Sequence, residues 1–250
     1  MLTSQRRALI TARLSRDGEV VAKALSEELA LSEDTIRRDL REMAAEGLLR
    51  RVHGGALPLE PALPDFSERR AIGADVKQAL GRKGAELIRP GQLVFLDGGT
   101  TNAALARALP RDMKATIATH SPTIAAELER HAAEVILVGG VLYKHSMVAV
   151  GSLALSAIAT MRPDLFFLGV TGLHPVSGLT TGDMEEAAIK RAIAGQAAET
   201  VLLAAADKFD AVSPHRIMAT DRLSRLIVPE GLEDAALAPY RALGIAVMPA

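Results

Sequence analysis

Apolar residues recur at helical spacing in the first 57 positions. Leu9, Ile10 and Leu14 share one face of a helix that Thr3 or Ser4 can cap and that Gly18 ends. A short strand at 20–21 and a second helix at 22–29 follow. Ser32 is a typical N-cap for a third helix, which Gly47 can end. The apolar face of this third helix is formed by Ile36, Leu40 and Met43.

A glycine pair interrupts the apolar residues that follow the third helix. Leu48 to Val52 and Ala56 to Leu57 flank Gly54 and Gly55, which predicts a short β-hairpin. The N-terminal segment is therefore expected to fold as a small α+β winged helix-turn-helix.

The pattern changes after residue 66 to short apolar runs that alternate with amphipathic segments. This alternation predicts a larger α/β domain with a mostly parallel sheet covered by helices on both faces. Strands are expected at 92–96, 115–118, 135–138, 165–170 and 201–205. Helices are expected at 75–89, 101–109, 122–130, 153–161 and 184–198.

Prolines mark the boundary between the two patterns. Pro58, Pro61 and Pro64 fall at every third position, which favours an extended, semi-rigid linker. We therefore expect a reading head at 1–57, a linker at 58–65 and an α/β domain at 66–250.

Composition narrows the classes of protein that this chain can belong to. Of its 250 residues, 49% are hydrophobic and 24% charged, which indicates a folded globular protein. The absence of cysteine excludes disulfides and thiolate metal sites. The histidines are scattered, and neither a signal peptide nor a membrane-spanning stretch is recognised. We expect a soluble, cytoplasmic protein with no metal, no cofactor and no membrane partner.

The third helix carries the side chains that a DNA-reading helix needs near its N-terminus. Ser32, Thr35, Arg37 and Arg38 can bind base edges or phosphates, since arginine offers a bidentate fork to guanine. The outward-facing residue Arg41 and the hairpin residues Arg51 and His53 complete this predicted DNA-binding set. The net charge of −1 does not by itself indicate nucleic-acid binding. A solvated helix face, with the arginines paired to Glu33, Asp34 and Glu42, is the competing interpretation.

A glycine-containing loop lies between an expected strand and an expected helix. In Leu96-Asp-Gly-Gly-Thr-Thr101, the glycines allow close approach of a ligand. Backbone N–H groups and the hydroxyls of Thr100 and Thr101 can bind a phosphate at the start of the helix. Taken alone, such a loop is at least as often a tight connection, and it matches no nucleotide-binding fingerprint.

Two ordered motifs resemble one family of regulators. Thr35-Ile-Arg-Arg-Asp-Leu40, followed by Gly47-x-x-x-Arg51-x-His-Gly-Gly-Ala56, is similar to the signature of DeoR-type repressors. The resemblance implies a winged helix-turn-helix that docks on operator DNA. It also implies a C-terminal sensor domain similar in fold to ribose-5-phosphate isomerase.

The resemblance extends over most of the chain and implies an effector site. Its Asp-x-Gly-Thr-Thr loop matches Asp97, Gly99, Thr100 and Thr101, and a departure occurs at Ala205, where many relatives carry aspartate. Asp207 is adjacent to Lys208 but offset from that position. The implied effector-binding residues are Arg69, Lys77, Asp97, Gly98, Gly99, Thr100, Thr101, Ser121, Gly139, Gly140, Gly172, Glu186, Lys190 and Lys208.

Three functions compete at this point. The first is a repressor of a carbohydrate-metabolism operon that a phosphorylated sugar or related metabolite releases from its operator. Because palindromic operators match two-fold symmetry, this function predicts a homo-oligomer, either a dimer or a tetramer. The second is a sugar-phosphate isomerase-like enzyme, with Asp97 and Glu186 as acid and base. The third is a protein-interaction module, which the outward-facing Arg37 and Arg38 disfavour.

Overall fold

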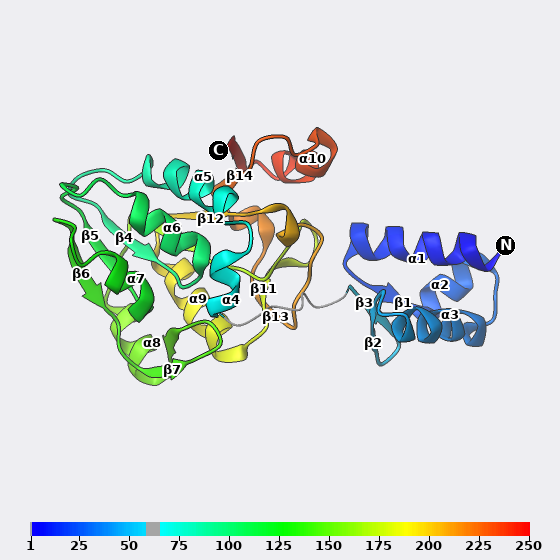
Figure 1. Ribbon diagram of the computed structural model, residues 1–250. Helices are drawn as coiled ribbons and strands as arrows, with labels where there is room; N and C mark the ends of the chain where they lie inside the picture. Colours follow the sequence, from blue (N-terminus) through cyan, green and yellow to red (C-terminus); the bar gives the residue numbers. More distant parts are fainter. Residues whose placement is uncertain (1, 59–65) are drawn as a thin grey trace.

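The computed structural model describes residues 2–58 and 66–250. Figure 1 shows a small head, which contains the N-terminus, beside a larger α/β domain. Most of the expected linker, residues 59–65, lies outside the described residues, whereas Pro58 is described and belongs to no helix or strand. The buried apolar residues of the head, from Ile10 to Ala56, form a core of their own.

The head has the expected winged helix-turn-helix topology. Its helices pack around a three-stranded sheet of order β1-β3-β2. The first helix differs from expectation at its start, because Leu2 is the N-cap and Thr3 is already helical. The elements are α1 (Thr3–Asp17), β1 (Val20–Val21), α2 (Ala22–Leu29), α3 (Glu33–Ala45), β2 (Arg50–Val52) and β3 (Gly55–Leu57).

The local signals read from the sequence explain how the elements of the head end and begin. Gly18 ends α1 in the left-handed region at φ 75°, where glycine is favoured. The Ser32 side chain accepts a hydrogen bond from the Thr35 backbone N–H at 3.2 Å and so caps α3. Ile36, Leu40 and Met43 are buried, as their spacing predicted. The opposite face of α3 is therefore turned outward.

The large domain contains the expected parallel sheet, with more strands than expected. Its spatial order is β15-β14-β12-β9-β4-β5-β6, and every pair of neighbours is parallel. The expected strands are confirmed as β4, β5, β6, β9 and β12, and two more lie near the C-terminus. The strands are β4 (Leu93–Leu96), β5 (Thr116–Thr119), β6 (Glu134–Leu137), β9 (Leu165–Leu168), β12 (Glu199–Leu203), β14 (Arg225–Val228) and β15 (Ala246–Pro249).

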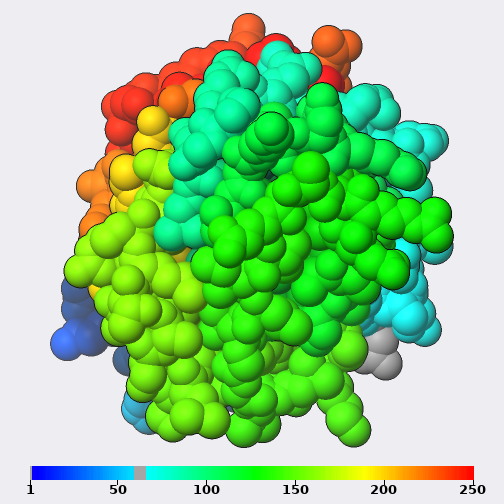
Figure 2. All heavy atoms as spheres, turned by 90° about the vertical axis from the view of Figure 1, so that its left-hand side faces the viewer, coloured from blue at the N-terminus to red at the C-terminus, as the bar shows by residue number. Residues whose placement is uncertain are grey.

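Helices cover both faces of this sheet. Alternate residues of one strand point to opposite faces, so Phe166 packs in one apolar cluster with α8, α9 and α10, whereas Phe167 packs in another with α5, α6 and α7. Figure 2 shows the molecule turned by 90° from the view of Figure 1. The face toward the reader is built from the green segments, which include β6, α7 and α8. The helices are α4 (Phe66–Ala71), α5 (Ala74–Ala85), α6 (Thr100–Ala108), α7 (Pro122–Glu127), α8 (Ser152–Ala159), α9 (Met184–Gln196) and α10 (Asp234–Ala242).

Two small antiparallel sheets, which the sequence did not predict, complete the domain. The first pairs β7 (Val141–Tyr143) with β8 (Val148–Val150). The second has the order β10-β11-β13 and contains β10 (Gly172–His174), β11 (Gly178–Thr181) and β13 (His215–Met218). The end of β10 contacts the end of α1 in the head, where the ring of His174, the last residue of β10, lies 2.6 Å from the Ser15 carbonyl oxygen.

Close packing of α5 on α6 fixes the position of α6, whose first residues border the candidate site. A Cβ atom added at Gly81 of α5 would lie 2.7 Å from the Ala104 backbone of α6. Only glycine permits this approach, and Leu80 and Leu105 are fully buried beside it.

Two features are absent from the residues that the structure describes. None of their helices is both long enough and apolar enough to cross a bilayer. Within the same residues, no three side chains of the histidine, cysteine, aspartate and glutamate types gather as metal ligands would.

Candidate functional site

A cavity lies at the point where the sheet changes its direction of growth. From β4 the chain builds toward β5 and β6, and it then returns to place β9 on the other side of β4. Ligands of open α/β sheets bind at such a switch point, at the carboxyl ends of the strands. A cavity of about 700 Å³ lies there, between the ends of β4, β9 and β12.

The loop after β4 brings a helix N-terminus to this cavity. Gly99 adopts φ 115°, outside the range that other residues favour, and α6 begins at Thr100. Asn102 fixes the loop by donating hydrogen bonds to the Asp97 carbonyl at 3.1 Å and to the Phe167 carbonyl at 2.9 Å. Since the first N–H groups of a helix have no partner within it, this end of α6 favours an anion.

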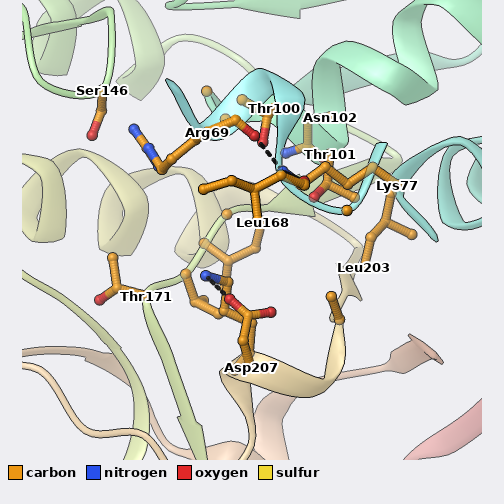
Figure 3. A pocket seen from close by; sticks show the side chains of 18 of the residues that line it. Arg69, Lys77, Thr100, Thr101, Asn102, Ser146, Leu168, Thr171, Leu203 and Asp207 are labelled. Atoms are coloured by element: carbon orange, nitrogen blue, oxygen red, sulfur yellow. Dashed lines mark hydrogen bonds and ion pairs between the residues drawn. The ribbon is translucent and has the colours of Figure 1, made fainter. Parts of the chain in front are cut away.

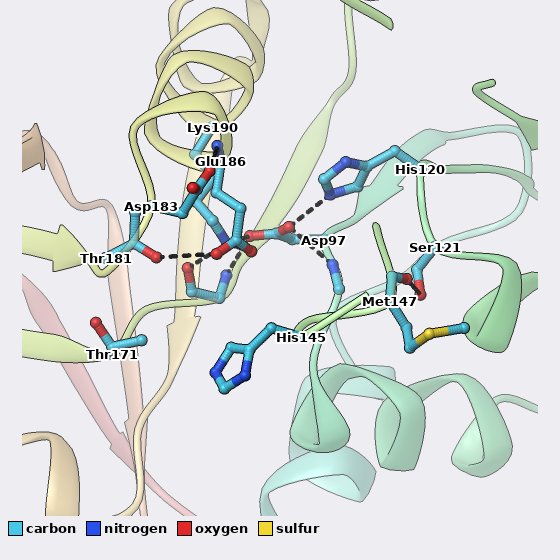
Figure 4. Close-up of polar contacts among 12 residues, drawn as sticks. Asp97, His120, Ser121, His145, Met147, Thr171, Thr181, Asp183, Glu186 and Lys190 are labelled. Atoms are coloured by element: carbon cyan, nitrogen blue, oxygen red, sulfur yellow. Dashed lines mark hydrogen bonds and ion pairs between the residues drawn. The ribbon is translucent and has the colours of Figure 1, made fainter. Parts of the chain in front are cut away.

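Asp97 itself lies under the loop rather than in the cavity. Its side chain is 0% exposed and accepts hydrogen bonds from the Gly98 and Gly169 backbones at 2.7 and 2.8 Å. The Lys190 ammonium donates to it at 2.7 Å, and the His120 ring lies 2.7 Å away on the other side. Figure 4 shows this carboxylate enclosed by its partners. Asp97 therefore ties β4, β9 and α9 together.

The electrostatics of this cluster favour its charged form. Burial would raise the pKa of Asp97, but the positive charge of Lys190 and the hydrogen bond from His120 hold it well below its ordinary value. Burial would lower the pKa of Lys190, yet the carboxylates of Asp97 and Glu186 raise it above the ordinary lysine value. Both groups stay ionised across the neutral range.

Three other cations line the cavity, namely Arg69, Lys77 and Lys208. Arg69 comes from α4 and donates to the His145 carbonyl at 3.0 Å. Lys77 of α5 donates to the carbonyls of Arg69 and Ile72, so it also closes the end of α4. Burial, together with the charges of Lys208 and Arg69, lowers the pKa of Lys77. Figure 3 shows Arg69, Thr101 and Lys77 around the cavity, with Asp207 on its opposite side. Because these cations outnumber the carboxylates of the lining, the cavity suits an anion.

The structure brings most of the expected effector residues to one cavity. Those that line it are Arg69, Lys77, Gly98, Gly99, Thr100, Thr101, Glu186, Lys190 and Lys208. Those that do not line it are Asp97, Ser121, Gly139, Gly140 and Gly172. Ser121 donates instead to the Met147 carbonyl at 2.9 Å, and Gly172 packs against the Ala211 backbone.

Several lining residues were not predicted from the sequence. They are polar side chains near strand ends, namely Asn102, Ser146, Thr171 and Thr181, together with Asp207. Thr171 follows β9 at the switch point, so the rule for ligand position in α/β sheets was a usable signal. Asp207 forms an ion pair with Lys208 at 2.9 Å. It places a carboxylate at the cavity, although the position that carries aspartate in many relatives is Ala205 here.

The predicted DNA-binding residues lie on the outer side of the head. Arg37 and Arg38 on α3 form exposed ion pairs with Glu33 and Glu42, at 2.7 and 3.0 Å. Exposed pairs of this kind stabilise a protein by little, so the arginines can exchange these partners for DNA. Ser32 and Thr35 share a hydroxyl contact of 2.8 Å, and the exposed side chains include Arg41, Arg51 and His53.

A winged helix-turn-helix joined to an α/β domain with an anion-favouring cavity defines a two-domain transcription regulator. The comparisons with known proteins identify the family. Residues 6–61 match the DeoR-like helix-turn-helix domain, and residues 73–230 match the DeoR C-terminal sensor domain. The chain belongs to the DeoR family of transcriptional regulators.

Full-length relatives agree with this assignment. The chain is 34% identical to the HTH-type transcriptional regulator GlpR of Haloferax volcanii, covering 94% of this chain and 92% of that protein. It is 33% identical to the glycerol-3-phosphate regulon repressor of Escherichia coli K12, covering 84% of each. The family and these relatives are transcriptional regulators, not enzymes, so the isomerase hypothesis is set aside.

Solved structures are more distant. A ribose 5-phosphate isomerase from Methanocaldococcus jannaschii aligns with a TM-score of 0.41 at 15% identity, covering 54% of each chain. The full-length sorbitol operon regulator SorC from Klebsiella pneumoniae aligns with a TM-score of 0.35 at 14% identity, covering 84% of this chain and 91% of that one.

Proposed function

We propose that this regulator represses transcription from an operator and is released when a phosphorylated small metabolite occupies the cavity at the switch point. The observation that carries the proposal is the convergence of the α6 N-terminus with Arg69, Lys77 and Lys208 on one cavity. A phosphate there receives backbone and hydroxyl hydrogen bonds from the loop and positive charge from the side chains. Repression is supported by relatives described as repressors.

The class of metabolite follows from the two kinds of lining. Besides the loop and the cations, Thr171, Glu186 and Asp207 line the cavity and offer polar atoms to hydroxyl groups. We therefore propose a phosphorylated sugar or polyol as effector. One relative is described as a glycerol-3-phosphate regulon repressor, which makes glycerol 3-phosphate a reasonable first probe.

The reading head is proposed to dock α3 in the major groove, with Ser32, Thr35, Arg37, Arg38 and Arg41 near the bases and phosphates. Arg51 and His53 on the hairpin β2–β3 would contact the backbone beside the groove. A homo-oligomer, either a dimer or a tetramer, would match a two-fold symmetric operator. The proposed boundaries are a head at 1–57, a linker at 58–65 and a sensor domain at 66–250.

The effector site is tested by thermal-shift measurements with phosphorylated sugars and polyols and their unphosphorylated counterparts. A ligand that binds only the folded state raises the melting temperature. The shift is expected with phosphorylated compounds alone, and Thr100→Ala or Lys208→Ala should abolish it. Lys114→Ala, an exposed lysine away from the cavity, is the matched control. A shift that survives in Thr100→Ala and Lys208→Ala contradicts the proposed site.

The DNA site is tested with an operator selected by the wild-type protein from random duplexes. Arg38→Ala is expected to weaken operator binding by about 1–3 kcal/mol if the guanidinium contacts a base. The ligand-induced thermal shift should stay unchanged, because Arg38 lies in the head. Arg89→Ala, an exposed arginine of the large domain, serves as the control. Unchanged operator affinity in Arg38→Ala would contradict the proposed contact of Arg38 with the operator.

A further inference from the structure

The hairpin β10–β11 lies between the cavity and the reading head. At its base, Thr171 and Thr181 line the cavity. At its turn, His174 contacts the last turn of α1. Thr171 and His174 are three positions apart, which in an extended strand corresponds to about 10 Å. The hairpin thus contacts both the cavity and the head.

The base of the hairpin is tied to the cavity by its own hydrogen bonds. The Thr171 backbone N–H donates to the Thr180 carbonyl at 3.0 Å, and the Thr171 hydroxyl lies 2.5 Å from the Ser213 hydroxyl. Thr181 donates to Glu186 at 3.4 Å. A ligand that displaces Thr171 or Glu186 therefore acts on both strands of the hairpin.

The hairpin is stiff enough to transmit such a displacement. Leu173 and Leu179, one from each strand, are 0% exposed in the main core, and they face each other in the antiparallel register. Tyr240 donates to the Leu173 carbonyl at 3.3 Å, and Thr220 donates to the His174 carbonyl at 2.8 Å. Densely packed elements move as units rather than deforming locally.

At the turn, His174 holds a defined tautomer. The ring is 0% exposed, and its Nδ1 accepts hydrogen bonds from the backbones of Val176 and Ser177 at 3.1 and 3.0 Å. Since Nδ1 is an acceptor, the proton of the neutral ring lies on Nε2. Nε2 donates to the Ser15 carbonyl at 2.6 Å. This carbonyl belongs to the last turn of α1, where a helix has no internal donors left.

The contact continues from α1 to the reading helix. Arg6 of α1 holds Asp39 of α3 with two hydrogen bonds, at 2.6 and 3.1 Å. Gly18, directly after α1, approaches the turn so closely that an added Cβ would lie 1.7 Å from the Ser177 hydroxyl oxygen. A shift of the turn therefore reaches α1, and through Arg6 it reaches α3.

We propose that the hairpin β10–β11 couples the effector cavity to the reading head through the hydrogen bond between His174 and Ser15. This inference rests on the proposed function, because it takes the cavity as the effector site. His174 is a positioning residue: it contacts neither the proposed effector nor DNA, and it sets how α1 sits on the large domain.

The experiment measures amide hydrogen exchange in the full-length protein with and without glycerol 3-phosphate. In the wild type, the ligand should slow exchange at 97–102 and change exchange at 14–20. His174→Asn keeps an acceptor near the Nδ1 position for the turn but cannot reach Ser15. In this variant the response at 97–102 should remain and that at 14–20 should vanish. Without ligand, exchange at 14–20 should rise about fivefold, the factor for one lost hydrogen bond.

A second pair of variants tests the contact independently of the histidine. Gly18→Ala brings a methyl group against Ser177 and should also abolish the response at 14–20. Adding Ser177→Gly removes that clash and should restore it. Gly47→Ala controls for backbone strain, because Gly47 has φ 70° but nothing within 4 Å of an added Cβ.

The possible failures are distinguishable. If neither glycerol 3-phosphate nor any other phosphorylated compound of the thermal-shift panel gives a response at 97–102 in the wild type, the proposed effector site is overturned, and the coupling with it. A response at 97–102 without one at 14–20 would overturn the coupling alone. A response at 14–20 that persists in both His174→Asn and Gly18→Ala would overturn the assignment of the hairpin.

Discussion

Replacing Asp97 with asparagine is expected to destabilise the protein by about 3–5 kcal/mol, the cost of breaking a buried ion pair. The carboxylate is 0% exposed and accepts from Gly98, Gly169 and Lys190 at 2.7, 2.8 and 2.7 Å. An amide has a single oxygen, so its NH2 group would face one of these donors. It would also leave the buried Lys190 ammonium with Glu186, 3.9 Å away, as its remaining carboxylate.

Urea and thermal unfolding followed by circular dichroism measure this loss, since the chain has no tryptophan. For a chain of this size each kcal/mol shifts the melting temperature by about 2–4 °C, so we expect a fall of roughly 6–20 °C. Asp207→Asn is the matched control, because the Asp207 side chain is 65% exposed and its ion pair contributes about 0–1 kcal/mol. If Asp97→Asn cost no more than this control, the proposed structural role of Asp97 would be refuted.

The acid dependence of the same variant gives a second readout. The pKa of Asp97 lies well below its ordinary value in the folded state, so its contribution is complete above the unfolded pKa of about 3.9. The contribution is lost as pH falls further, toward the folded pKa. The stability difference between wild type and Asp97→Asn should therefore stay constant near neutral pH and shrink below about pH 4.

Three further predictions concern packing and titration. Gly81→Ala should destabilise the large domain in urea unfolding, because the added Cβ would lie 2.7 Å from backbone atoms of α6. Gly195→Ala, whose added Cβ has nothing within 4 Å, should be neutral or stabilising by about 0.4–1 kcal/mol. Equal losses of stability in the two variants would contradict this prediction. Burial raises the pKa of Tyr240, so stability is complete below the unfolded pKa of about 10 and is lost as pH rises above it. Tyr143→Phe leaves Tyr240 as the single tyrosine. In this variant, phenolate absorbance should appear well above pH 10 and together with unfolding. Phenolate absorbance at a lower pH, in protein that is still folded, would count against burial as the cause of the raised pKa. Ile36→Ala should cost the head about 2–5 kcal/mol, measured by urea unfolding, since Ile36 is 0% exposed; a loss under 1 kcal/mol would contradict its place in the core.

Elements with strong local signals were predicted closely. The apolar period of α3, the Ser32 cap and the glycine after α1 each depend on a few neighbouring residues, so the sequence contains them in full. The start of α1 was placed wrongly, because the Leu2 backbone N–H donates to the Gln5 side chain at 3.1 Å. That contact fixes the helix start in place of a Thr3 or Ser4 cap.

Short strands that depend on distant partners were missed. β10 and β11 have three and four residues, and β13, the third strand of their sheet, pairs with β11 from more than 30 positions away. Segments this short carry too little periodicity to be recognised before their pairing is known. The same reason explains why the contact between His174 and the head was not expected.

For the candidate site, the sequence by itself determined the chemistry: a glycine loop before a helix, two threonines and several lysines, in an order that resembles one family. The tertiary structure decided which of these residues face the cavity. It buried Asp97 under the loop, because a carboxylate surrounded by four donors is satisfied inside the protein. It also placed Thr171 and Asp207 at the cavity, because parallel strands end at one edge of the sheet whatever their distance along the chain.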